Sequence, residues 1–325
     1  MIKVLYLPLN AGGNIQQATY NAWNELPFIN MKIFDFMNVH EVTKNKNKVN
    51  DEFIKSVAEF KPDLVHMQLQ MTDIITPQSI KTAKSIVKNC IFSNWSGDVR
   101  NHASKEMVSI SSVVDHTFIS STGQIELYKN SGAKNVRYWQ IGYDHDLFYP
   151  LNKNNFKYDL VFAGNMYQAN VFADAQKRSD LILKIKKSLG DRFKIFGSGY
   201  PHYFGGGIEP LPFNKLNEAY NDSMCILSIS NYNDIPHYFS DRLLICMASG
   251  RPTISYRFPE YESYFSDNSD ILIAHDAEEI LSKVQYCKLN IDKANSIGRN
   301  GARKVYAEHT YRSRIIELLK ILGLI

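Results

Sequence analysis

The sequence predicts two α/β domains in succession, each a doubly wound parallel sheet with helices on both faces. Strand-like and helix-like segments alternate through the first half of the chain, and the alternation starts again in the second half. A chain of 325 residues also suits two domains of about 150 residues better than a single core. Because a polar segment at residues 149–155 separates the two arrays, we expect domains at residues 1–150 and 151–325.

Short apolar runs predict the strands of the first domain, and amphipathic segments predict its helices. The Lys- and Asn-rich residues 44–50 read as a solvated loop. The expected strands are residues 3–9, 31–36, 64–68, 90–94, 116–120 and 136–139. The expected helices are residues 15–25, 51–60, 77–88 and 123–131.

The second domain repeats this alternation. We expect a helix that begins at Ser240 or Asp241 and ends at Gly250, and the amphipathic residues 297–322 predict a closing helix. The remaining expected helices are residues 179–189 and 215–221, and the expected strands are residues 159–163, 193–196, 225–228 and 253–256.

Composition and charge exclude several classes of protein. The apolar fraction of 44% is that of an ordinary globular chain, and no apolar run approaches the roughly 18 residues of a membrane span. Residues 2–7 read as a buried strand and not as a signal peptide, so we expect a cytoplasmic protein. Four scattered cysteines without a C-x-x-C pair favour reduced thiols over metal ligands or disulfides. The net charge of +4 permits a polyanionic acceptor without arguing strongly for one.

Residues 238–265 are the most informative stretch of the chain. A helix that begins at Ser240 or Asp241 leaves its first backbone N–H groups free to hold an anion. Ser240 is a suitable N-cap, and Asp241 and Arg242 fall in the first turn. We expect the anion to be a nucleotide diphosphate.

The A-x-G-x-P sequence at residues 248–252, followed by a strand, a loop and an acidic residue, resembles the C-terminal signature of GT-B glycosyltransferases. Within that fold the chain is most similar to the CgeB-like (spore maturation) glycosyltransferases, whose closing helix resembles AEHTYRSR at residues 307–314. Residues 140–150 resemble the passage that ends the first domain of many GT-B enzymes.

This resemblance implies a glycosyltransferase that moves a sugar from a nucleotide-sugar donor to an acceptor hydroxyl. The donor, by default UDP-glucose among UDP-sugars, would bind the second domain and the acceptor the first. The terminal helix would cross back to brace the first domain, with His309 in a mechanical role.

The same resemblance implies donor contacts on the second domain. Arg178 and Arg242 would hold the diphosphate, because an arginine fork fits phosphate oxygens. Glu262, or else Glu260, would bind ribose, and Asp241 could accept hydrogen bonds from ribose or sugar hydroxyls. The nucleotide's heterocyclic base would rest near Gly197 and near the start of an expected strand at residues 208–211. The predicted donor set is Gly164, Asn165, Arg178, Gly197, Ile208, His237, Tyr238, Ser240, Asp241, Arg242 and Glu262.

The chain departs from the retaining GT-B enzymes of the sucrose-synthase-like group, which carry two glutamates separated by seven residues. Alignment of residues 247–250 on their A-M-A-x-G sequence places His237 and Ile245 at those positions. Neither residue is acidic, so retention of configuration is not assigned. A non-catalytic nucleotide-sugar-binding protein of the same fold stays open as an alternative.

Two features of the first domain point to ligands. Gly12 and Gly13 let the backbone approach donor phosphate or acceptor closely, although they do not form the G-x-G-x-x-G fingerprint of dinucleotide sites. Asp98 follows a buried strand in a polar turn, where α/β sheets place their ligands. It is the candidate general base of an inverting reaction, with His102 behind it, and helix capping is the alternative role.

The sequence Asp144-His145-Asp146 spells the D-x-D motif of metal-dependent glycosyltransferases, but it lies in the interdomain passage. We therefore expect no metal and no cofactor beyond the nucleotide sugar, with the leaving diphosphate neutralised by a helix dipole and basic side chains. The acceptor stays open between a glycan, a small molecule and a modified base of DNA. The basic residues that would suit DNA are Lys44, Lys46, Lys48, Arg100 and Lys105.

Overall fold

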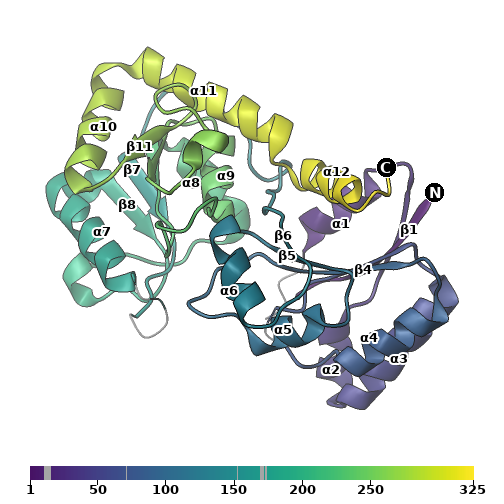
Figure 1. Cartoon of the computed structure of the whole chain (residues 1–325). Coiled ribbons are helices and arrows are strands. Elements are labelled where there is room, and N and C mark those ends of the chain that lie inside the picture. Colours follow the sequence, from purple (N-terminus) through teal and green to yellow (C-terminus); the bar gives the residue numbers. More distant parts are fainter. Residues whose placement is uncertain (11–15, 71, 152, 169–171, 173) are drawn as a thin grey trace. The chain divides into compact units, whose positions relative to one another are not determined.

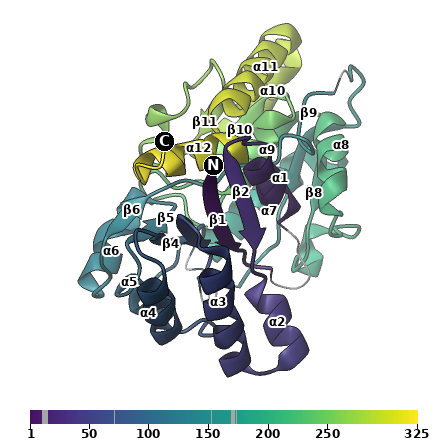
Figure 2. The same cartoon turned by 90° about the vertical axis from the view of Figure 1, so that its right-hand side faces the viewer.

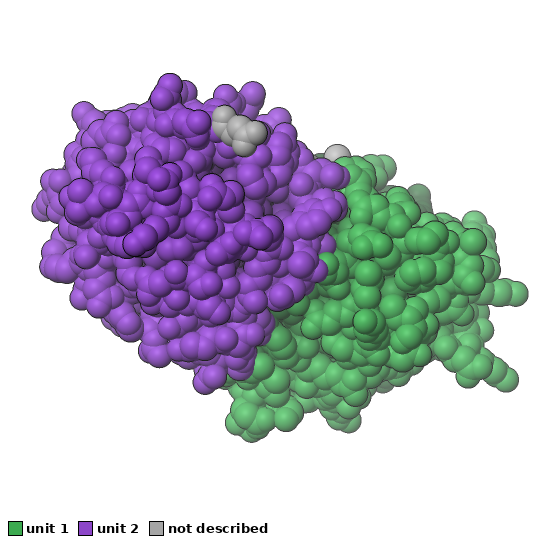
Figure 3. Space-filling view, turned by 90° about the horizontal axis from the view of Figure 1, so that it is seen from above, with its two compact units in different colours: residues 1–141, 311–325 green, residues 142–310 purple. Residues whose placement is uncertain are grey.

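The structure is a computed structural model that describes residues 1–10, 16–70, 72–151, 153–168, 172 and 174–325. It divides into two compact units, unit 1 (residues 1–141 with 311–325) and unit 2 (residues 142–310), which Figure 3 colours separately. Each unit contains one parallel sheet between layers of helices, which confirms the predicted fold class. No helix among the described residues is both long and apolar enough to cross a bilayer.

The sheet of unit 1 is built around its first strand. All strands are parallel, in the order β2-β1-β3-β4-β5-β6. Val4 pairs with Met31 on one side and with Leu64 on the other, and Val4 to Leu7 are fully buried because helices cover both faces. The strands are β1 (Ile2–Leu7), β2 (Ile29–Ile33), β3 (Leu64–Met67), β4 (Ile91–Ser96), β5 (His116–Ile119) and β6 (Val136–Tyr138).

Helices on one face of this sheet share a core with its central strands. Phe53 and Ile80 from two of these helices pack with Val65 and Phe92 of the strands. Helices α3 and α4 run side by side (Figures 1 and 2). The helices that contribute to this face are α2 (Phe36–Thr43), α3 (Lys46–Phe60), α4 (Pro77–Ile86) and α5 (Lys105–Ser111), and α6 (Ile125–Asn130) leads into β6.

The terminal helix completes the other face of the same sheet. Helices α1 (Gln17–Asn24) and α12 (Tyr311–Ile321) pack together there, with Trp23 against Ile315 and Leu318. The Trp139 indole N–H donates to the Arg314 carbonyl at 3.0 Å, and Arg314 Nε donates to the carbonyl of Ile141 at 3.2 Å. The predicted return of the terminal helix to the first domain is confirmed.

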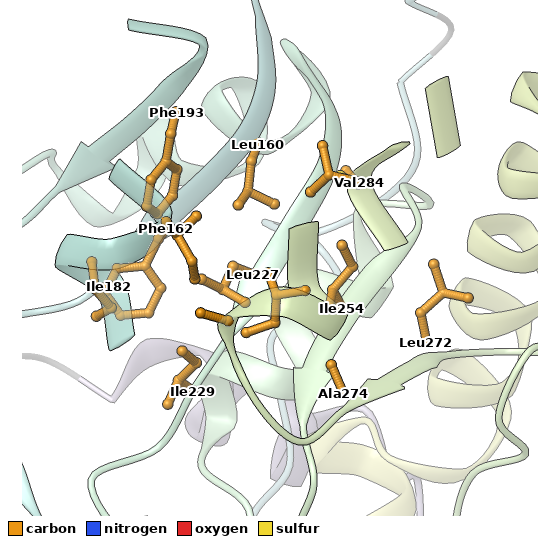
Figure 4. Close-up of a cluster of buried hydrophobic side chains, with 14 of the residues drawn as sticks. Leu160, Phe162, Ile182, Phe193, Leu227, Ile229, Ile254, Leu272, Ala274 and Val284 are labelled. Carbon is orange, nitrogen blue, oxygen red and sulfur yellow. The ribbon is translucent and has the colours of Figure 1, made fainter. Parts of the chain in front are cut away.

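Unit 2 has the strand order β11-β10-β9-β7-β8, again parallel. Leu160, Phe162 and Leu227 point from the strands into a core that Ile182 and Val284 close from the helices (Figure 4). The strands are β7 (Tyr158–Ala163), β8 (Phe193–Phe196), β9 (Ser223–Ser228), β10 (Thr253–Tyr256) and β11 (Leu272–Ala274). The helices are α7 (Ala175–Leu189), α8 (Leu216–Asn221), α9 (Asp241–Ala248), α10 (Ala277–Leu289) and α11 (Ile291–Glu308).

The position of β7 in this sheet creates a switch in chain direction. Its neighbours are β8, which follows it in sequence, and β9, so the crossovers after β7 and β9 run to opposite sides. Helices α7 and α9 accordingly cover opposite faces of the sheet (Figure 1). In open α/β sheets, ligands bind at the carboxyl ends of the strands where such a switch occurs.

Several predicted elements differ from the observed ones. Helix α3 begins at Lys46, capped by the Asn45 side chain, so the predicted loop at residues 44–50 is largely helical. The segment at residues 208–211 belongs to none of the described strands, although the Glu209 carbonyl accepts the Gly197 N–H. The predicted closing helix is two helices that break at His309, whose ring is buried 5.5 Å from that of Phe265.

Candidate functional site: an arginine pair at the end of β7

Two arginine side chains converge on Gly164, the first residue after β7. Arg178 comes from α7 and Arg242 from the first turn of α9. A β-carbon placed on Gly164 would lie 2.9 Å from Arg178 Nη2 and 3.0 Å from Arg242 Nη2. The space that a side chain would need at this position is therefore occupied by two guanidinium groups.

Backbone and amide oxygens hold both guanidinium groups. Arg242 Nε donates to the Ala163 carbonyl at 2.7 Å and its Nη1 to the Ile229 carbonyl at 3.2 Å, at the ends of β7 and β9. Arg178 Nη1 donates to the Asn165 carbonyl at 3.1 Å and also to the Asn231 side chain. These contacts fix the direction of each fork without neutralising its charge.

The ring of Phe162 supports both cations from the core side. The guanidinium carbon of Arg178 lies 5.2 Å from the ring centroid and that of Arg242 lies 5.6 Å from it. Such contacts are favourable for a cation but much weaker than a desolvated ion pair. They hold the groups in place and leave the excess positive charge uncompensated.

None of the ion pairs among the described residues includes Arg178 or Arg242. Arg178 is only 3% exposed, and its Nε and Nη2 have no hydrogen-bond partner among the described groups. Burial, and then repulsion from Arg242, lower the pKa of Arg178 to about 9, so it is still a cation at neutral pH. A buried charge without a counter-charge is costly, and an anion at this point would remove that cost.

A cavity of about 260 Å³ opens beside the arginine pair, at the carboxyl ends of β7 and β8. Gly197 brings these two turns together: a β-carbon there would lie 2.2 Å from the Gly164 carbonyl oxygen, and its φ is +151°. Its lining is partly polar and partly aromatic and aliphatic. The predicted residues that line it are Gly164, Asn165, Gly197, Asp241 and Arg242, joined by Tyr167, Phe196, Pro210, Leu211, Phe213, Leu216, Tyr220 and Ile245.

The N-terminus of α9 borders this cavity through Asp241 and Arg242. Ser240 occupies the N-cap position with extended backbone, as predicted, but its side chain makes no capping bond to the first turn. Its hydroxyl instead lies 3.5 Å from that of Ser230. Because the side-chain cap is absent, the partial positive charge of this helix end is available to a ligand.

Other predicted donor residues lie away from the described lining of this cavity. Ile208 packs against the core of unit 2, and the His237 ring stacks edge-on to Tyr264 at 5.7 Å. Tyr238 follows in the same loop, and its N–H donates to the Ile235 carbonyl. The Glu262 carboxylate is 60% exposed and lies 4.0 Å from Arg257 Nη2. Gly12 and Gly13 lie outside the described residues.

In unit 1, Asp98 stands two residues beyond β4 with its side chain 58% exposed. Its carboxylate pairs with Arg100 Nη2 at 3.1 Å, and His102 is exposed nearby in the sequence. The alternative helix-capping role is wrong, because Ser104 caps α5 by accepting the Met107 N–H at 3.2 Å. The carboxylate of Asp98 is thus accessible from solvent.

The D-x-D sequence forms a local turn in unit 2. Asp144 Oδ1 accepts the N–H of Asp146 at 2.9 Å and that of Leu147 at 3.3 Å. Burial raises the pKa of Asp144. One carboxylate of the motif is therefore committed to the backbone.

Comparison with known proteins bears on the fold. Residues 177–320 match a family model described as Glycosyl transferase-like, and no curated protein matches the chain. HepE from Anabaena, in complex with UDP and glucose, is 10% identical over 100% of both chains with a TM-score of 0.65.

Two further solved structures are similar over nearly their whole length. A glycosyltransferase from Rickettsia africae ESF-5 is 15% identical over 98% of this chain and 97% of its own, with a TM-score of 0.68. An α-glucosyltransferase in complex with UDP and a 13-mer DNA containing an HMU base is 12% identical over 99% of both chains, also with a TM-score of 0.68. The chain has the two-domain fold of the GT-B glycosyltransferases.

Proposed function

We propose that this protein is a glycosyltransferase that binds a nucleoside diphosphate sugar, with a UDP-sugar as the expected donor, on unit 2. The observation that carries the proposal is the uncompensated arginine pair at Gly164, beside a cavity and the N-terminus of α9. The family match over residues 177–320 and the UDP in similar structures support it. We further propose a CgeB-like enzyme, which the AEHTYRSR sequence at residues 307–314 supports.

The chemistry of the transfer explains why two cations are needed. The acceptor oxygen forms a bond to the anomeric carbon while the bond from that carbon to the diphosphate oxygen breaks. The electron pair of the broken bond stays on the diphosphate, whose negative charge grows as the transition state is reached. Preorganised donors aimed at such developing charge contribute much of an enzyme's rate enhancement. Arg178 and Arg242 fit that role together with the helix dipole of α9.

The acceptor proton needs a base within reach, and we assign Asp98 to this role. It lies beyond the carboxyl end of β4, and its carboxylate is exposed. Arg100, 3.1 Å away, would orient this carboxylate, and His102 is the second choice. Two arginines already neutralise the diphosphate and the turn occupies Asp144, so we propose a reaction without a metal.

Calorimetry with UDP tests the donor site. We expect Arg242→Ala and Arg178→Ala each to weaken UDP binding by about 10- to 100-fold, the effect of a lost charge-assisted contact. Arg303→Ala, an exposed arginine on α11 bonded to Asn300, is the matched control and should bind UDP like the parent. Equal UDP affinity in the parent and in both cavity variants would refute the donor site.

DNA as the acceptor is a second candidate, favoured by the distribution of charge. Unit 1 carries 18 Lys and Arg against 13 Asp and Glu, whereas unit 2 carries 19 against 20. The positive balance of the chain therefore comes from the unit to which we assign the acceptor. Binding to duplex DNA with a hydroxymethylated base should fall steeply with salt if phosphates are contacted. Salt-independent or undetectable binding would leave a glycan or a small molecule as acceptor.

A further inference from the structure

A second cavity of about 180 Å³ lies in unit 2, at the carboxyl ends of β9 and β10 and against the first turns of α7. It is separate from the cavity beside Gly164, and of the donor contacts described above it shares Arg178. Two aliphatic side chains form part of its wall. Its polar lining residues are Asp174, Lys177, Arg178, Asn233, Asp234 and Tyr256.

Arg178 joins the two cavities. It lines the second cavity, while its Nη2 lies 2.9 Å from the β-carbon position of Gly164, which lines the first. This Nη2 is buried and has no hydrogen-bond partner among the described groups. A diphosphate held by Arg178 and Arg242 would therefore lie next to both cavities.

We propose that the second cavity holds the sugar of the donor, an inference that rests on the proposed function. Pockets for drug-sized ligands have volumes of about 300 to 1,000 Å³, so a cavity of about 180 Å³ suits a single ring and not a second nucleotide. Its lining contains both hydrogen-bond acceptors and donors, which is what the hydroxyl groups of a sugar require.

The loop after β9 and the start of α7 prepare these polar groups. The Asn233 side chain is tied to the backbone of Ser230, with contacts of 3.0 and 3.1 Å, which fixes the turn that presents Asp234. Asp174 precedes α7, and its carboxylate makes no capping bond to that helix. The two carboxylates can therefore accept bonds from sugar hydroxyls.

The charges in the cavity select the class of sugar. Lys177 Nζ lies 2.9 Å from Asp174 Oδ1, so these two charges compensate each other. Arg178 is engaged by the diphosphate, and no ion pair among the described residues includes Asp234. The loaded site then has an excess negative charge, which repels a hexuronate carboxylate. The geometry points to an uncharged hexose as the transferred sugar.

Calorimetry with UDP, UDP-glucose and UDP-glucuronate separates the contributions of the two cavities. The parent should bind UDP-glucose at least tenfold more tightly than UDP-glucuronate, because the glucuronate carboxylate would lie next to the like charge of Asp234. Asp234→Asn should leave the Kd for UDP unchanged and weaken the binding of UDP-glucose, relative to that of UDP, by about tenfold. It should also reduce the difference in affinity between UDP-glucose and UDP-glucuronate. Asp191→Asn, a fully exposed acid on the same unit, should change none of these ratios.

The outcomes separate this inference from the proposed function. Suppose that the parent binds UDP but Asp234→Asn changes neither the affinity for UDP-glucose relative to UDP nor that relative to UDP-glucuronate. That result, or a parent that prefers UDP-glucuronate, would overturn the sugar assignment and leave the donor site standing. If the parent does not bind UDP, the donor site fails, and the sugar subsite fails with it. Because Asp234 is exposed, Asp234→Asn should fold like the parent, which a thermal melt would verify.

Discussion

Arg178 and Arg242 meet at Gly164 from opposite faces of one sheet, with their Nη2 atoms 2.9 and 3.0 Å from the position of a β-carbon. Helices α7 and α9 follow different strands, so each of them contributes one of the two cations. The switch in chain direction at β7 brings their first turns to the same strand end. The pair is therefore a product of topology, and it can be tested through the glycine that separates the two guanidinium groups.

Gly164→Ala should weaken UDP binding about tenfold or more while the protein stays folded. The added methyl would collide with the Nη2 atoms of both arginines, the flexible ends of long side chains, and with Phe162 Cζ at 2.9 Å. The arginine ends can move away, which distorts the anion site, while the fully buried Phe162 ring must shift within the core, so the variant should also be somewhat less stable. Gly206→Ala is the control, because a β-carbon there meets nothing within 4 Å. Parental UDP affinity in Gly164→Ala would contradict the role of the pair.

Asp98→Asn should bind UDP-glucose like the parent but turn over about a hundred to ten thousand times more slowly, the usual loss on removal of a positioned base. The measurement is single-turnover transfer, with Asp51→Asn on α3 as an exposed acidic control. The product should have the anomeric configuration opposite to that of the donor, as seen by NMR. A retained configuration, or near-parental turnover in Asp98→Asn, would eliminate this base.

Turnover should survive excess chelator, and the double change Asp144→Asn with Asp146→Asn should leave the rate nearly unchanged. An asparagine oxygen can still accept the two backbone N–H groups that Asp144 Oδ1 accepts now, so the turn should persist. Loss of activity with chelator and its recovery with manganese would show that a metal is required.

Unit 2 should lose stability below about pH 4 through Asp159. Burial raises the pKa of this carboxyl, but bonds from Arg192 and Lys288 outweigh burial, and the net pKa lies below its ordinary value. A carboxyl whose pKa is lower in the folded state stabilises the protein above its unfolded pKa, and this contribution disappears as the pH falls through the folded value. Urea unfolding at pH 7 and pH 3 should show a smaller pH dependence for Asp159→Asn than for the parent. If the pH dependence of stability were the same in Asp159→Asn and in the parent, groups other than Asp159 would cause the loss of stability in acid.

Much of the fold could be predicted because strands buried on both faces are continuous apolar runs, as in Ile2–Leu7 and Tyr158–Ala163. Helix α2 and helix α5 are short and carry little periodic signal, and α3 begins within a Lys- and Asn-rich stretch that resembles a loop. The break at His309 depends on aromatic partners far away in the sequence, such as Phe239. Such tertiary contacts override local periodicity.

The candidate site could be predicted only in part for a similar reason. Gly164 and Arg242 stand in short motifs, a glycine after a strand and an arginine in a first helical turn. Tyr167 lines the cavity from a loop and Phe213 from a single 3-10 turn, neither of which has a periodic pattern, and the PLPF sequence after the triple glycine hints at Phe213. Asn231, which holds Arg178, is 53 residues away from it in the sequence.

The return of α12 to unit 1 has a consequence for biosynthesis. When a ribosome has translated residues 1–141, the sheet of unit 1 is complete, but Trp23 and its neighbours still lack the cover of Ile315 and Leu318. Unit 2 is continuous in sequence and can close its own core as it emerges. Unit 1 must wait about 170 residues longer, or roughly ten to thirty seconds at typical elongation rates, with an apolar face open to chaperones or to other nascent chains.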